Sequence, residues 1–182
     1  NTYLCCDDID NDYKCDCNDD CVGEYDECGI CNGPGLEEGF NCDGFPHDFA
    51  YNLSSEQAFY YISSIQDMYG NEIEQGDWLG IFNGETCVGS RQWDTDNCSG
   101  GVCDLPAMGD DGSAWSNTAG YLLEGDQPSF KLYDISEGKY FDVSPLSAES
   151  FGFESFGTFE KQKEHFLKQS LFEKKEKECK KK

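Results

Sequence analysis

Long apolar runs, histidine and the signatures of common enzymes are what this sequence lacks. No run approaches the ~18 apolar residues that a membrane-spanning helix needs, so no membrane span is predicted. Only two histidines are present, His47 and His165, and both are expected to be solvated surface side chains. There is no Gly-x-Ser-x-Gly elbow, phosphate-binding loop or His-Glu-x-x-His motif. We therefore expect no enzymatic activity; a glycosidase-type carboxylate pair is an alternative, but nothing selects one pair among so many carboxylates.

Positive charge is scarce over most of the chain. Before Thr158 there are 4 basic and 32 acidic residues, whereas residues 158–182 hold 9 lysines and 5 glutamates. The formal net charge of −24 disfavours nucleic acid as a partner, because a phosphate backbone would be repelled. An acidic body with a basic tail is instead complementary to its own copy. Head-to-tail contacts that do not close into a ring generate filaments, so the charge distribution favours a homopolymer.

Cysteine is abundant, with 12 residues in a chain of 182. Thiols stay reduced in the cytosol, so this density predicts a disulfide-stapled extracellular protein, either secreted or on the cell surface. Zinc binding by Cys28-x-x-Cys31 is the alternative, but no second pair follows at the spacing of a zinc finger. The chain does not begin with Met, which predicts a processed terminus or a fragment boundary.

The pairing of the cysteines is predicted in part. Those from Cys5 to Cys42 are expected to form a self-contained cluster, and Cys98 is expected to pair with Cys103 across a short Gly-containing loop. Cys87 and Cys179 are left over, and they pair with each other, pair with a neighbouring chain or stay free. The cysteines assigned to disulfides are Cys5, Cys6, Cys15, Cys17, Cys21, Cys28, Cys31, Cys42, Cys98 and Cys103.

Composition divides the chain into three segments. Residues 1–48 have few apolar side chains, so disulfides must replace a core there. Residues 49–150 alternate aromatic and β-branched residues with turn signals, which predicts a β-sandwich. Residues 151–182 are expected to form a strand over 151–159 and a Lys-rich helix that begins at an N-cap, Thr158. The predicted class is therefore all-β, with an irregular segment before the sandwich and a helical tail after it.

Within the predicted sandwich, a strand is expected over residues 58–65 and a shorter one over 119–123. Hairpins are expected over 78–93, where Asn83-Gly84 suits a type I′ turn, and over 130–143, around Glu137-Gly138. Residues 98–117 are predicted to be a long loop. The segment 151–159 either completes its own sheet or is donated to the sheet of a neighbouring copy.

Alternating acidic residues predict calcium as a possible cofactor, because side chains at every second position of a tight loop can converge on one hard cation. The candidate ligands fall into an N-terminal set and a second set in two later loops. The alternatives are a solvated acidic surface and turn chemistry. The candidates are Asp8, Asp10, Asp12, Asp16, Asn18 and Asp20, and then Asp94, Asp96, Asp110 and Asp111.

The string DECGICNGPG at residues 26–35 is the most specific motif. It resembles the Asp-Glu-Cys-Gly-Val-Cys-Gly-Gly repeats of large secreted proteins of aquatic bacteria and some algae, and a stretch of secreted thrombospondin-repeat metalloproteinases. The aspartate run before it resembles calcium-binding thrombospondin-type modules. The region that follows resembles a module of the same bacterial surface proteins. The resemblance covers residues 21–143, implies an extracellular module and transfers no catalytic residues. The matching residues after the motif are Asp77, Trp78, Gly80, Phe82–Gly84, Cys87–Gly89, Trp93, Asp94, Gly101–Asp104, Met108–Gly112, Gly120, Tyr121, Phe130 and Lys131.

Two functions are consistent with the sequence. The first is a structural subunit of an extracellular fibre or surface appendage, built from copies of this chain. The second is a carbohydrate-binding or adhesive module, in which Trp93 and Trp115 stack on sugar rings; core packing is the alternative for both tryptophans. Asn52 and Asn97 lie in Asn-x-Ser sequons and are candidate glycosylation sites in a eukaryotic secreted chain.

Overall fold

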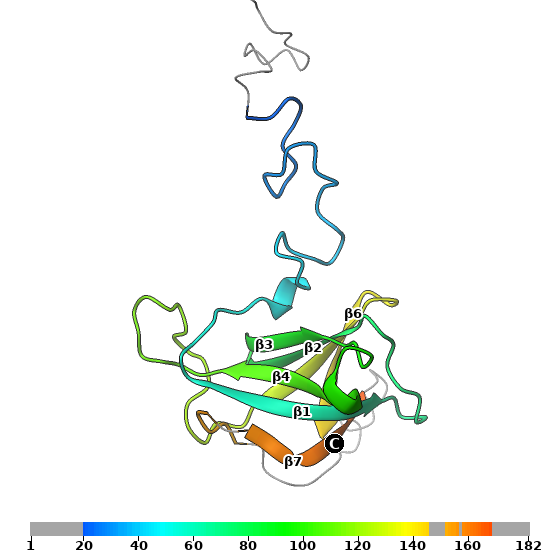
Figure 1. The fold of residues 1–182 in the computed structure, drawn as a ribbon, viewed down its shortest axis with the longest axis vertical. Helices are drawn as coiled ribbons and strands as arrows, with labels where there is room; N and C mark the ends of the chain where they lie inside the picture. Colours follow the sequence, from blue (N-terminus) through cyan, green and yellow to red (C-terminus); the bar gives the residue numbers. More distant parts are fainter. Residues whose placement is uncertain (1–19, 146–151, 157, 169–182) are drawn as a thin grey trace, which may run out of the picture. The chain divides into compact units, whose positions relative to one another are not determined.

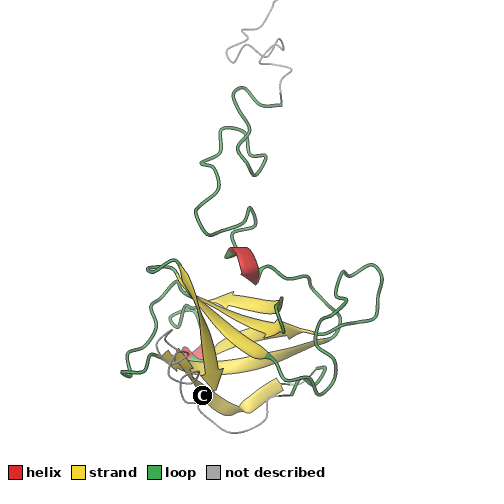
Figure 2. Ribbon diagram, turned by 180° about the vertical axis from the view of Figure 1, so that it is seen from behind, coloured by secondary structure: helices red, strands yellow, loops and turns green. Residues whose placement is uncertain are grey.

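The structure is a computed structural model that describes residues 20–145, 152–156 and, as backbone alone, 158–168 (Figures 1 and 2). The chain divides into two compact units between His47 and Asp48. Across the described residues there is no α-helix, and only two 3-10 turns occur, η2 (His47–Phe49) and η3 (Ser99–Gly101). The predicted all-β class is confirmed. No helix in the described part of the chain has the length and apolarity to cross a membrane.

The first unit, over its described residues 20–47, is irregular. Its only pairings are two isolated bridges, Tyr25 with Cys31 and Phe40 with Pro46. Two disulfides hold it, Cys21–Cys31 and Cys28–Cys42. Both lie inside the predicted cysteine cluster, whose members before residue 20 fall outside the described residues. Large side chains such as Tyr25 stay exposed, so crosslinks take the place of a core in this unit.

The second unit contains one seven-stranded sheet in the order β3-β2-β5-β6-β7-β1-β4. All neighbouring strands are antiparallel except β1 and β7, which are parallel. The strands are β1 (Gln57–Gln66), β2 (Trp78–Asn83), β3 (Thr86–Gln92), β4 (Cys103–Met108), β5 (Ser129–Asp134), β6 (Lys139–Pro145) and β7 (Thr158–Lys168).

The sheet curls into two halves. Strand β6 meets β7 over only three residue pairs, from Val143 to Pro145, and this short pairing joins β3-β2-β5-β6 to β7-β1-β4. The outer strands of the two halves, β3 and β4, then approach each other. A Cβ atom added to Gly89 would lie 1.7 Å from the Pro106 carbonyl oxygen, so only glycine fits at this seam. The Arg91 guanidinium crosses the seam to the carboxylate and the carbonyl oxygen of Asp104.

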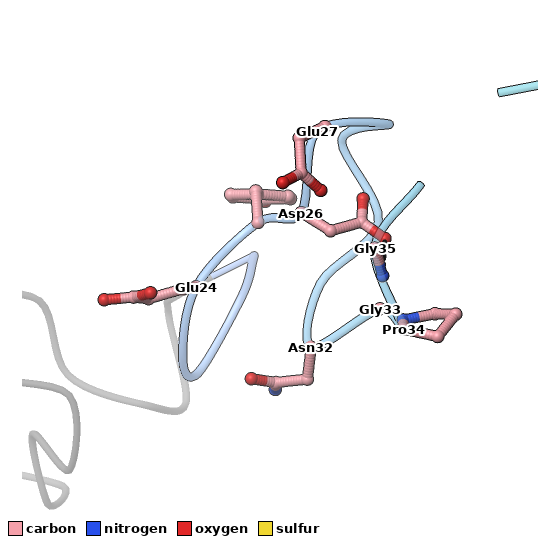
Figure 3. Close-up of a pocket in the computed structure, with 8 residues that line it drawn as sticks. Glu24, Asp26, Glu27, Asn32, Gly33, Pro34 and Gly35 are labelled. Carbon is pink, nitrogen blue, oxygen red and sulfur yellow. Dashed lines mark hydrogen bonds between the residues drawn. The ribbon is translucent and has the colours of Figure 1, made fainter. Parts of the chain in front are cut away.

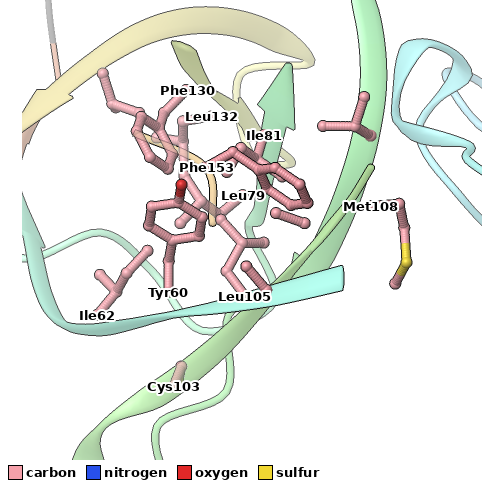
Figure 4. Close-up of a cluster of buried hydrophobic side chains, with 14 of the residues drawn as sticks. Tyr60, Ile62, Leu79, Ile81, Cys103, Leu105, Met108, Phe130, Leu132 and Phe153 are labelled. Carbon is pink, nitrogen blue, oxygen red and sulfur yellow. The ribbon is translucent and has the colours of Figure 1, made fainter. Parts of the chain in front are cut away.

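The main core lies between the two halves (Figure 4). Strand β1 shows how the sequence builds it, because Ala58, Tyr60 and Ile62 are buried while the residues between them are half-exposed. This period of two places one face of the strand on the core. Ile81 and Leu132 come from the opposite half and are fully buried.

A smaller aromatic cluster covers the outer face of the β2–β5–β6 half. The Phe49 ring lies 5.6 Å from the ring centroids of both Phe82 and Tyr140. The Phe49 carbonyl oxygen accepts a hydrogen bond of 2.8 Å from the Ser90 hydroxyl. The segment that enters the sheet unit is thereby fixed on this face.

Three local predictions need correction. The 78–93 hairpin forms, but Asn83 pairs with Thr86, so the two-residue loop is Gly84-Glu85 and only Gly84 has a positive φ, 61°. Residues 103–108 form β4 inside the predicted loop; Pro106 is tolerated because β4 is an outer strand of the sheet order. Residues 119–123 are not a strand, because Leu122 makes only an isolated bridge with Gly109.

The C-terminal prediction is also wrong in part. The helix expected from Thr158 is not present over Thr158–Lys168, which form β7 between β1 and β6. Pairing with two strands outweighs the helix propensity of Lys and Glu here. The strand expected over 151–159 is irregular at 152–156. Phe153 nevertheless packs into the core of its own chain, as the self-packing alternative proposed. Residues 169–182 lie outside the described residues.

Candidate functional site

The loop between β4 and β5 carries the most exposed large apolar side chain among the described residues. The Trp115 side chain is 93% exposed, whereas Trp93 is only 3% exposed and belongs to the core. Core packing, the alternative predicted for Trp93, is confirmed, so this ring cannot stack on a sugar. Trp115 is the one of the two tryptophans that can contact a ligand.

Asp111 fixes the residues around Trp115 through hydrogen bonds. Its Oδ1 accepts hydrogen bonds from the Ser113 backbone N–H at 2.9 Å, the Ser116 hydroxyl at 2.6 Å and the Thr118 hydroxyl at 3.0 Å. The bond from Ser116 is the main reason that the pKa of Asp111 is lowered from its usual value. Thr118 is fully buried, so the network is anchored to the body of the sheet unit.

Asp110 fixes both sides of the same loop. Its two carboxylate oxygens accept hydrogen bonds from the backbone N–H groups of Gly112, at 2.9 Å, and Gly120, at 3.2 Å. Both aspartates predicted as calcium ligands are thus used in turn chemistry, the alternative that the sequence left open. The loop is held by its own side chains in the shape that presents Trp115.

The segment before β1 is tied to this loop. The backbone N–H of Asn52 donates to the Tyr121 hydroxyl at 2.7 Å, and its side-chain amide donates to the Asn117 carbonyl at 3.3 Å. Leu53 follows and is 77% exposed. The candidate glycosylation site Asn52 is exposed beside the Trp115 loop; whether it carries sugar stays a prediction. Asn97 is exposed elsewhere, and its amide donates to Asp94.

A second exposed apolar pair was not anticipated from the sequence. Leu123 is 59% exposed and Phe156 is 74% exposed. The Ser155 backbone N–H donates to the Glu124 carboxylate at 3.2 Å, which brings the two residues' segments together. Phe156 has φ 58°, a value that bulky residues rarely adopt. The alternation of Phe with small residues at 151–159 singled out this segment in the sequence, but it predicted a strand and not an exposed Phe156.

The predicted metal ligands in the described residues do not come together. No group of three or more His, Cys, Asp or Glu side chains that could hold a metal ion occurs within residues 20–145 and 152–156. The Asp94 carboxylate instead accepts hydrogen bonds from Asn97. Asp96 and Asp20 are exposed. The other N-terminal candidates lie outside the described residues, so calcium binding there stays a prediction.

In the first unit, the DECGICNGPG motif folds around the Asp26 carboxylate (Figure 3). It accepts hydrogen bonds from the backbone N–H groups of Cys28 at 3.0 Å, Ile30 at 2.8 Å and Gly35 at 3.2 Å. These bonds, with that from Ile30 the strongest, lower the pKa of Asp26. The open hollow beside it is lined by Glu24, Glu27 and Asn32. Asp26 is therefore a structural residue of this turn, and the hollow offers no cluster of free ligands.

The remaining cysteines are placed as follows. Cys98 forms a disulfide with Cys103, which confirms the predicted pair. Cys87 is free and buried, and its burial raises the pKa of its thiol to about 12. A thiol with so high a pKa is not a nucleophile at neutral pH. Cys179 lies outside the described residues.

Comparisons of the chain with family models, with curated proteins and with solved structures gave no match.

Proposed function

We propose that the protein is an extracellular, non-enzymatic binding module that holds a carbohydrate against Trp115. The exposure of Trp115 on a loop fixed by Asp110 and Asp111 carries this proposal. At 93% exposure, the Trp115 ring gains almost none of the free energy that burial of an indole provides. A ligand that packs against the ring would supply that burial. The flat ring can pack against the C–H face of a pyranose.

The loop's hydrogen bonds support this function because they reduce the cost of binding. A loop that already has its bound shape loses little conformational entropy when a ligand arrives. The Asp111 network reaches from the buried Thr118 to the residues flanking Trp115. We read the curled sheet as a β-sandwich, in which loops at one end commonly carry the binding surface. Disulfides in both units are compatible with an extracellular location.

A glycan array with the oxidised full chain tests the proposal. Trp115→Ala should weaken binding to any retained glycan by about tenfold or more, equivalent to about 1.4 kcal/mol. Asp111→Ala should weaken it less, because the ring remains but the loop loses its anchor. The matched control is Tyr69→Ala, which removes an aromatic ring that is 80% exposed on the β1–β2 loop. Loss of binding with Tyr69→Ala, or equal binding by Trp115→Ala and wild type, would refute the assignment.

A structural subunit of an extracellular fibre is the second candidate function. The specific observation in its favour is the charge distribution, with 32 acidic residues before Thr158 and 9 lysines after it. Electron microscopy of negatively stained protein tests it, because a fibre subunit should form filaments at low ionic strength. Dispersed particles at every concentration would count against it.

A further inference from the structure

The sheet unit has two different ends, and the parallel pairing of β1 and β7 defines them. Thr158 pairs beside Phe59 near the start of β1, and Leu167 pairs beside Gln66 at its finish. The ten residues of β1 span roughly 30 Å at ~3.3 Å per residue. Whatever follows Lys168 therefore begins at the finishing end of β1, about that distance from its start.

The starting end of β1 carries the second exposed apolar pair. Leu123 and Phe156 together with the carboxylates of Glu56, Glu124 and Glu154 form what we call the Phe156 surface. The Phe156 backbone N–H donates to the Gln57 carbonyl at 2.7 Å, which fixes it beside the first residue of β1. Ser155 links two of these carboxylates. Its hydroxyl donates a hydrogen bond to Glu56, and its backbone N–H donates one to Glu124.

The Phe156 surface combines exposed apolar area with negative charge. Leu123 and Phe156 stay largely in solvent, and no part of the chain within the described ranges covers them. Contiguous exposed apolar groups rimmed by polar residues are typical of interaction sites. The carboxylates around them would repel an acidic partner and attract a basic one. A suitable partner therefore presents a short apolar element next to several positive charges.

Residues 171–182 of this chain have that composition. Leu171 and Phe172 are adjacent, and six lysines and three glutamates follow them. We propose that the Phe156 surface of one copy binds residues 171–182 of a second copy. The chain leaves β7 at the finishing end of β1, and the acceptor surface lies at the starting end of β1. Copies placed end to end would therefore bring the two together, and a linear assembly of any length would keep one free donor at one end and one free acceptor at the other.

Such a contact repeats without closing, so it builds a linear chain of copies. Binding by the same molecule would need residues 169–182 to run back along roughly 30 Å of their own sheet, which a contact between copies placed end to end does not require. The proposal deepens the second candidate function, on which it rests, and is independent of sugar binding by Trp115. Because lysines and carboxylates contribute to the contact, it should weaken as salt rises.

Sedimentation velocity of the oxidised full chain tests the contact, in a Cys179→Ser background that excludes disulfide crosslinking through that residue. The protein with an unchanged Phe156 surface should form concentration-dependent assemblies at an ionic strength of about 0.01 M, where charges interact over ~30 Å. Leu123→Ser combined with Phe156→Ser should weaken assembly at least about tenfold. The matched control is Leu53→Ser, which removes a similarly exposed apolar side chain near the Trp115 loop. Thermal melts check that each variant is folded.

The outcomes separate the contact from the function. Assembly that survives in the folded double variant would overturn the Phe156 surface while leaving fibre formation standing. A wild-type protein that stays monomeric at every concentration would overturn both. Assembly lost equally in Leu53→Ser would place the contact at the Trp115 loop and contradict the proposal. Replacing Lys174, Lys175 and Lys177 by Glu should abolish assembly as well, and an unchanged assembly would remove residues 171–182 as the donor.

Discussion

The two units of this protein are ordered by different means. Over the described residues 20–47 of the first unit, Tyr25, Ile30 and Leu36 remain exposed, and order comes from two disulfides and the hydrogen bonds of Asp26. In the sheet unit a contiguous core is buried between the two halves of the sheet. A disulfide acts mainly by restricting the unfolded chain, whereas a core acts by removing apolar surface from water. The same chain therefore contains one unit whose order rests on disulfides and one whose order rests mainly on a core, which the Cys98–Cys103 bond supplements.

The largest single-residue effect is expected in the core. Ile81 is fully buried on β2, so Ile81→Ala should lower the free energy of unfolding of the sheet unit by about 2–5 kcal/mol. The control Leu53→Ala removes an exposed side chain and should change it by less than about 0.5 kcal/mol. Chemical denaturation followed by tryptophan fluorescence measures both. Equal effects of the two substitutions would show that Ile81 does not lie in a packed core.

A smaller effect is expected at the seam between the two halves of the sheet. Gly89→Ala places a Cβ atom against the Pro106 carbonyl, which is backbone and cannot move aside cheaply. It should destabilise the sheet unit by about 1–3 kcal/mol. Gly152→Ala is the control, because the closest atom that the added Cβ meets is the end of the flexible Gln127 side chain. If both variants melt at the wild-type temperature, β3 and β4 are not in contact.

The smallest effect concerns pH and the first unit. The pKa of Asp26 is lowered by hydrogen bonds that exist only in the folded turn, so its contribution is present above the unfolded pKa of about 4. That contribution is lost as pH falls through the lower folded-state pKa. Asp26→Asn should remove this acid dependence from residues 20–47. Asp67→Asn breaks a similar turn in the sheet unit and serves as the control. NMR shifts of the Ile30 and Gly35 amides against pH would report it, and an unchanged profile in Asp26→Asn would contradict the role.

Much of the sheet unit was predictable because its signals are local. The alternation along β1 and the hairpins at 78–93 and 130–143 need only the period of two and a turn residue. β4 was missed because Gly and Asp flank a six-residue strand that contains a proline. β7 was missed because its Lys/Glu composition favours a helix in isolation. Its strand state depends on β1 and β6, which no local pattern reveals.

The candidate site was predictable only in its parts. The sequence identified Asp110, Asp111, Trp93 and Trp115 as candidate site residues. It could not tell which of the two tryptophans is exposed, because burial depends on the whole fold. The turn-forming role of Asp110 and Asp111 was one of two alternatives until their hydrogen-bond donors were known. The Phe156 surface joins residues more than 30 positions apart in sequence through the Ser155–Glu124 bond. A contact of that range has no sequence signature in a single chain.

Hydrogen exchange of the full chain with and without reductant tests the difference between the two units most directly. Reduction removes Cys21–Cys31 and Cys28–Cys42, which contribute about 3 kcal/mol each. Reduction also breaks Cys98–Cys103, which belongs to the core of the sheet unit. Residues 20–47 should then lose their amide protection, while β1, β2 and β5 keep most of theirs, because the buried apolar side chains of the core remain packed. If the central strands lose protection together with residues 20–47, the sheet unit is not held by its core, and the account is contradicted.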